Sequence, residues 1–199
     1  MAEGAPPTEV PAPWFLDACV LYPQLLRSIL FGVAEAGLVR PYWSDRVLTE
    51  WRIAAARAGG MTAEAEARAR AEEMAARFPD ACLTPDPALE ASLRLPDPGD
   101  THVAAAAAAA EPPATIITLN MRDFPARRLA PHGLSATHPD GALWALHDTA
   151  PDAIDHAIRA SLAALSRPAG EPAGTGRAAL KRAGLPRLAK AWAAAQTPA

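Results

Sequence analysis

Four acidic residues stand where the chain is expected to leave a strand or to lie on a neighbouring helix, and their types suit metal chemistry. The first, Asp17, lies within an apolar run, residues 14–21, that is flanked by prolines. A short apolar run of this kind indicates a buried strand of a parallel sheet. A carboxylate there is costly to desolvate unless a positive or hydrogen-bonding group meets it. We therefore expect Asp17 at the carboxyl end of that strand, where open α/β sheets bind ligands.

The other three acids occupy comparable positions. Glu50 lies on an expected helix, Asp100 at the start of an Ala-rich helix, and Asp123 just beyond a β-branched strand. If the strands are parallel and adjacent, Asp17, Asp100 and Asp123 converge at one edge of the sheet, and Glu50 reaches them from above. The sequence thus predicts one cluster of carboxylates.

Such a cluster predicts a hard divalent cation. Neighbouring carboxylates repel one another unless a cation neutralises them, and oxygen ligands without His or Cys favour Mg²⁺ or Mn²⁺ over zinc. The chemistry that suits this site is phosphodiester hydrolysis, in which the metal polarises a phosphoryl oxygen and activates a water. We expect Asp17 to be a direct ligand and Asp100 a ligand directly or through water. Glu50 would orient the water or accept its proton, and Asp123 would complete the outer ligands or hold a second ion.

Each acid also has a simpler interpretation. Asp100 suits a helix N-cap, Asp123 suits a turn, and Glu50 suits the exposed face of a helix. Asp17 is the hardest to explain structurally, because an Asp beside a central apolar strand has few structural uses. It is the joint pattern that favours a functional site.

The elements that must position these acids alternate along the chain. Strands are expected at residues 14–17, 38–43, 82–84, 114–119 and 134–137. Helices are expected from residue 23 to Gly37, from Ser44 to about residue 58, over 63–77 and 101–110, and from Pro139 onward, with a loop over 85–98. This alternation predicts an α/β fold with a mostly parallel central sheet.

The 199 residues suffice for one well-buried domain and a small extension. We expect a flexible N-terminal arm over residues 1–13, the main domain over 14–148 and a helical C-terminal extension over 151–199. The extension carries seven Lys or Arg against three acids, in a chain whose net charge is −3. A basic extension on an acidic body fits a phosphate-contacting surface, and it fits plain solubility equally well.

The sequence predicts a cytoplasmic protein. No apolar stretch approaches the ~18 residues that a membrane span needs. The first residues lack the basic and apolar regions of a signal peptide. The two cysteines, Cys19 and Cys82, have no metal-site or redox spacing, and we interpret them as buried free thiols in a reducing compartment.

Four stretches, taken in order, resemble the PIN-domain ribonucleases, which include the VapC-type toxins of bacterial toxin–antitoxin pairs. The stretches are residues 15–23, 42–51, 97–105 and 117–125, and the likeness covers about residues 14–148. Residues 181–188 are similar to the C-terminal helical extension of one VapC subgroup. The resemblance implies a three-layer α/β/α fold and a Mg²⁺- or Mn²⁺-dependent endoribonuclease. It also implies an RNA substrate, a cognate antitoxin protein that inhibits by lying across the site, and often a homodimer.

The resemblance also assigns roles to particular residues. Asp17, Glu50 and Asp100 match the three main acids of the family. Many members have Asp where this chain has Asn120, with another acid at the position of Asp123. Asn120 supplies a ligand oxygen without a charge, which weakens any second metal site.

Further residues take secondary roles. Thr118 matches a common hydroxyl residue that would orient Asp17 or Asn120, and Asp97 is close enough to act as an auxiliary acid. Arg122 would contact substrate phosphates together with Arg127 and Arg128, although a solvated basic cluster explains these arginines equally well. His102 and His132 are interpreted as packed or surface residues and not as ligands.

Two alternatives stay open. One is another Mg²⁺-dependent phosphoryl hydrolase, such as a phosphatase with Asp17 as its nucleophile. Against it, the chain lacks the second Asp that haloacid-dehalogenase-type enzymes carry two residues later. The other is a non-catalytic PIN-like module that binds RNA or protein, which the residue Asn120 favours and the retained acids disfavour.

Overall fold

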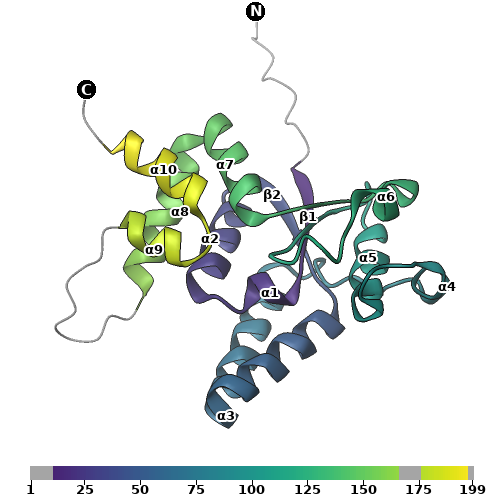
Figure 1. Ribbon diagram of the computed structural model, residues 1–199. Coiled ribbons are helices and arrows are strands. Elements are labelled where there is room, and N and C mark those ends of the chain that lie inside the picture. Colours follow the sequence, from purple (N-terminus) through teal and green to yellow (C-terminus); the bar gives the residue numbers. More distant parts are fainter. Residues whose placement is uncertain (1–10, 166–175, 197–199) are drawn as a thin grey trace, which may run out of the picture.

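A four-stranded parallel sheet forms the centre of the computed structural model, which describes residues 11–165 and 176–196 (Figure 1). The strand order is β2-β1-β3-β4, and every neighbouring pair is parallel. The strands are β1 (Ala12–Leu16), β2 (Val39–Tyr42), β3 (Thr115–Ile117) and β4 (Ser135–Thr137). All four strands therefore end at the same edge of the sheet, as the sequence predicts.

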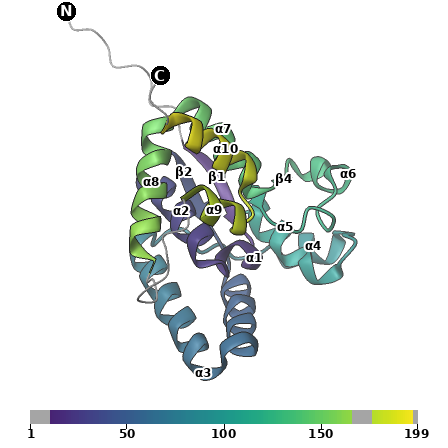
Figure 2. The same ribbon diagram turned by 60° about the vertical axis from the view of Figure 1, so that its left-hand side comes forward.

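Helices cover both faces of this sheet, which confirms the three-layer α/β/α fold. In both views, α2 (Gln24–Glu35) and α8 (Pro151–Ala164) lie on one side of the sheet and α5 (Thr101–Ala108) on the other (Figures 1 and 2). Helices α2 and α8 approach closely at Gly32, where a Cβ would come within 3.0 Å of the Ala157 side chain. The strands are short and apolar because they are covered on both faces, with Phe15, Ile116 and Ile117 fully buried.

Helix α3 (Asp45–Arg77) is a hairpin of two helical arms. Ser44 begins it by accepting a hydrogen bond from the Val47 N–H at 3.3 Å, as an N-cap should. Gly60 interrupts the helix with φ 68° and ψ −157°, a conformation that favours glycine. This is the break expected at Gly59-Gly60, and Figure 2 shows the two arms extending away from the sheet.

Three local expectations are wrong. The apolar run of residues 14–21 is not one strand, because β1 ends at Leu16 and residues 18–21 form the short helix α1 (Ala18–Leu21). The expected loop over 85–98 contains α4 (Pro87–Ser92), whose N–H at Ala88 is capped by the Asp86 carboxylate at 2.8 Å. The expected strand at 82–84 is a single bridge between Trp43 and Cys82.

The N-terminal arm expected over residues 1–13 falls mostly outside the described residues, and β1 already begins at Ala12. The remaining elements are η1 (Pro98–Asp100), α6 (Ala126–Leu129), η2 (Ala130–His132), α7 (Pro139–Thr149), α9 (Gly176–Arg182) and α10 (Pro186–Ala195). Among the described residues, no helix is both long and apolar enough to cross a membrane.

Helix α10 is attached to α7 through one buried carboxylate. Asp140, only 5% exposed, accepts hydrogen bonds from the backbone N–H groups of Arg187 and Leu188, each at 3.0 Å. These N–H groups lie in the first turn of α10, where the helix leaves its donors unpaired and favours a negative charge. The Arg187 guanidinium also lies 4.2 Å from the centroid of the Trp144 ring. The C-terminal helix is therefore packed onto the main domain.

Replacing Asp140 by Ala should destabilise the protein by about 2 kcal/mol, because two N–H groups in the first turn of α10 lose a charged acceptor. Urea unfolding followed by circular dichroism measures this change. Asp148→Asn is the matched control, since Asp148 lies on the same helix and is exposed. Equal stability of Asp140→Ala and the control would contradict this role for the carboxylate.

Candidate metal and catalytic site

Asp17 lies where β1 ends, and neutral donors hold its side chain. Its backbone N–H donates to the carbonyl of Ile117 on β3 at 3.2 Å. The carboxylate is only 8% exposed, and its Oδ2 accepts hydrogen bonds from Thr118 Oγ1 at 2.7 Å and from Cys19 Sγ at 3.1 Å. Burial, and then the charge of Asp17, raises the pKa of the Cys19 thiol to about 12, so that the thiol stays protonated and donates. Asp17 is thus fixed in place, and no side chain in the described part of the chain forms an ion pair with it.

The segment after β3 forms a compact turn beside Asp17. The hydroxyl of Thr118 donates to Asp17 and accepts from the Asn120 N–H at 3.0 Å, so it contacts both residues that it was expected to orient. Asn120 in turn donates its side-chain amide to Asp123 Oδ2, and the Asp123 N–H donates to the Asn120 carbonyl at 3.2 Å. Asp123 is therefore a turn residue that also presents a carboxylate next to the site.

Asp100 lies at the junction of η1 and α5. The capping role belongs to Asp97, whose Oδ1 accepts from the Gly99 N–H at 2.7 Å, while the side chain of Asp100 makes no capping hydrogen bond. Burial raises the pKa of Asp100 from its ordinary 3.8 to about 6, and the charges of Asp17, Asp97, Asp123 and Glu50 add to the increase in that order. The other acids that the sequence indicated thus all oppose the ionisation of the Asp100 carboxyl group.

Glu50 approaches this group from the first arm of α3 and contacts a buried histidine. Its Oε1 lies 2.9 Å from Nε2 of His102 and 3.7 Å from Nε of the exposed Arg46. His102 is packed, as one interpretation of the sequence had it, but its contact with Glu50 was missed. No sequence signal indicated this contact, because it depends on how α3 packs beside α5.

The donor set suits Mg²⁺ or Mn²⁺, since its atoms are carboxylate and amide oxygens. However, within residues 11–165 and 176–196, no three Asp, Glu, His or Cys side chains are close enough to hold one ion as they stand. Coordination of one ion by Asp17, Asp100 and Glu50 together would require these side chains to lie closer than they do here.

Arg122 lies in the turn between Asn120 and Asp123 and is exposed, as are Arg127 and Arg128. Their contact with phosphates stays a prediction.

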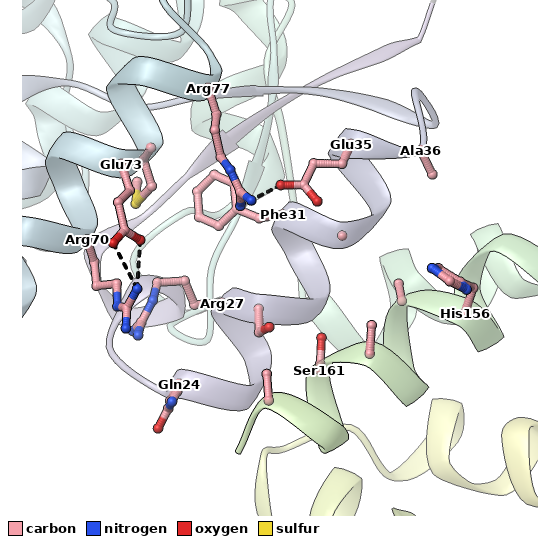
Figure 3. Close-up of a pocket in the computed structure, with 16 residues that line it drawn as sticks. Gln24, Arg27, Phe31, Glu35, Ala36, Arg70, Glu73, Arg77, His156 and Ser161 are labelled. Atoms are coloured by element: carbon pink, nitrogen blue, oxygen red, sulfur yellow. Dashed lines mark hydrogen bonds and ion pairs between the residues drawn. The ribbon is translucent and has the colours of Figure 1, made fainter. Parts of the chain in front are cut away.

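The surface also has hollows away from these acids. One of about 550 Å³ lies between α2, the second arm of α3 and α8, and Figure 3 shows Arg27, Arg70 and Arg77 around it. Two of these arginines are neutralised, because Arg70 pairs with Glu73 at 2.7 Å and Arg77 with Glu35 at 2.6 Å. None of the candidate acids lines this hollow. This hollow is therefore separate from the candidate site.

Comparison with protein families agrees with this picture. The family model of the PIN domain matches residues 14–122, more than half of the chain, and the chain therefore belongs to the PIN domain family. PIN domains are generally nucleases that use divalent metals. The match includes all the candidate acids except Asp123, which follows its last residue, as do Arg127 and Arg128. Neither the search of curated proteins nor that of solved structures returned a match.

Replacing Asp100 by Asn should stabilise the metal-free protein at pH 7.5, because it removes a charge that four other carboxylates oppose. Above pH 6 this charge lowers stability. As the pH falls from 6 towards 4, the folded state takes up a proton that the unfolded state does not, and the penalty disappears. After allowance for solvent screening of this partly exposed group, we expect a rise of roughly 2–4 °C in the unfolding midpoint.

Thermal unfolding in EDTA at pH 7.5 and pH 4 tests this expectation, with Asp148→Asn as the control. The gain should be present at pH 7.5 and nearly absent at pH 4. A gain of the same size at both values would show that the charge of Asp100 is not its cause.

Proposed function

We propose that this protein is an endoribonuclease that hydrolyses RNA phosphodiester bonds with Mg²⁺ or Mn²⁺. The observation that carries the proposal is the convergence of Asp17, Glu50, Asp97 and Asp123 on the carboxyl group of Asp100 at the carboxyl edge of the sheet. In a family of generally metal-using nucleases, such a cluster is the expected place for the cation. The choice of RNA rests on the likeness of residues 14–148 to PIN-domain ribonucleases.

Each residue then has a proposed role in metal binding or catalysis. Asp17, Asp100 and Glu50 would hold the cation, and Thr118 keeps Asp17 in position through its hydrogen bond of 2.7 Å. An ion held there would supply charge neutralisation and would polarise a phosphoryl oxygen. Glu50 orients the attacking water or accepts its proton. Asn120 has an amide carbonyl available for a ligand or water, because its NH₂ group already donates to Asp123.

We also propose a biological setting. The resemblance to VapC-type toxins supports a toxin–antitoxin pair, in which a cognate antitoxin protein covers the acidic site and a homodimer is the assembled form. The substrate would be cytoplasmic RNA, and Arg122 would contact its phosphates.

A second candidate is a PIN-like module that binds RNA or protein without catalysis. The spacing of the acids favours it, since no three of these groups in the described part of the chain are ready to hold an ion. The neutral residue Asn120 in an otherwise acidic cluster also favours it.

Purified protein should cleave a structured RNA with Mn²⁺ or Mg²⁺ and should lose cleavage in EDTA. Asp17→Asn should lower the rate at least about 100-fold, because a charged ligand at the reacting centre contributes on that scale. Asp148→Asn should cleave normally. A phosphomonoester assayed alongside should not be hydrolysed. If that substrate turns over and the RNA does not, the phosphatase alternative is correct.

Expression of the wild-type chain in bacteria should arrest growth, and expression of Asp17→Asn at the same level should not. Colony counts after induction, with immunoblotting to match protein levels, measure the difference. If both forms are equally harmless, the toxin assignment fails. If both are equally toxic, toxicity does not depend on this site.

A further inference from the structure

We propose that His102 is a positioning residue that holds the carboxylate of Glu50 beside Asp100. The inference rests on the proposed function for its consequence in metal binding. The contact itself is a feature of this structure and is testable without any metal.

His102 is a polar side chain enclosed by apolar ones. It is 0% exposed on α5, and the residues that follow it, Val103 and the alanines up to Ala107, are fully buried too. Neither ring nitrogen has a hydrogen-bond partner in the described part of the chain. Buried polar groups are nearly always paired, since an unpaired one is costly. A buried imidazole in this place therefore indicates that a hydrogen-bond partner for the ring lies nearby.

Glu50 is that partner. Its Oε1 lies 2.9 Å from His102 Nε2, within hydrogen-bond distance, although the ring N–H is not directed along the line between the two atoms. A small rotation of either side chain aligns them, with Nε2 carrying the hydrogen. The bond would join a neutral donor to a carboxylate, which is the stronger kind of hydrogen bond.

The contact matters because two groups, Arg46 and His102, compete for the Glu50 carboxylate. Its side chain is 39% exposed and also lies 3.7 Å from Nε of Arg46, an exposed residue that forms a closer ion pair with Glu90 at 2.9 Å. Arg46 draws Glu50 towards solvent, whereas His102 draws it towards α5. Asp100 is the N-cap of α5 and His102 is the second residue of this helix, so holding Glu50 at His102 keeps it at the end of α5 where the proposed ion would lie.

Two amide variants separate this role from simple packing. The side-chain amide of Gln reaches about as far as Nε2 of His, whereas that of Asn reaches only as far as Nδ1. His102→Gln and His102→Asn both bury one neutral amide, so they are matched in polarity. Only His102→Gln keeps a donor where Glu50 needs it.

The metal readout is the binding of Mn²⁺ to the full chain, measured by the electron paramagnetic resonance signal of free Mn²⁺. His102→Asn should weaken binding about tenfold, as loss of a ligand's supporting partner typically does, and His102→Gln should stay close to wild type. In the Glu50→Gln background, His102→Asn should have no further effect. Equal weakening in both amide variants, or a full further loss in the Glu50→Gln background, would overturn the proposal.

The metal-free readout is thermal unfolding in EDTA of His102→Asn, Glu50→Gln and the double variant. If the two side chains interact, the shift of the double variant will be smaller than the sum of the single shifts. Additive shifts would refute the contact whatever the metal does. If the shifts are coupled but the wild-type chain binds no Mn²⁺, the contact is supported and the proposed metal-dependent function is refuted instead.

Discussion

The repulsion among carboxylates at one edge of the parallel sheet is the constraint on which the rest of this site depends. Four acids oppose the ionisation of Asp100, and together with burial they raise its pKa to about 6. A protein that served stability alone would not bring these charges together, because each costs more when its neighbours are ionised. The arrangement becomes favourable when a hard dication lies among them. Within residues 11–165 and 176–196, no three of these side chains lie close enough to hold one ion as they stand, so binding would draw them together.

The scaffold keeps the acids close without neutralising the central one. Asp17 receives hydrogen bonds from a hydroxyl and a thiol, which fix its position and leave its charge intact. Asp97 takes over the capping of η1 and so frees Asp100 from that role. Glu50 is the exception, since it also lies near Arg46, and its position depends on a contact with the buried His102. The site is thus rigid at Asp17 and adjustable at Glu50.

Much of this was predictable from the sequence, and the reasons are local. Prolines and β-branched residues bounded the strands, and acids just after β1 and β3 had to meet once those strands were parallel neighbours. The end of the first strand was predicted to within a residue, but the short helix α1 after it was missed, because an apolar run does not reveal that its second half is helical. The short helix α4 was missed for a similar reason, since Pro and Asp suit both a loop and a capped helix start. The contact between His102 and Glu50 was beyond prediction, because it joins residues of two helices whose packing no periodicity specifies.

The central claim is that these acids share one divalent cation, and a crystal structure of the full chain grown with Mn²⁺ tests it most directly. The account predicts one strong anomalous peak at the Mn²⁺ absorption edge, between the carboxylates of Asp17 and Asp100, with Glu50 turned towards it. Peaks found only at other surface acids, with Asp17 and Asp100 still apart, would contradict the account.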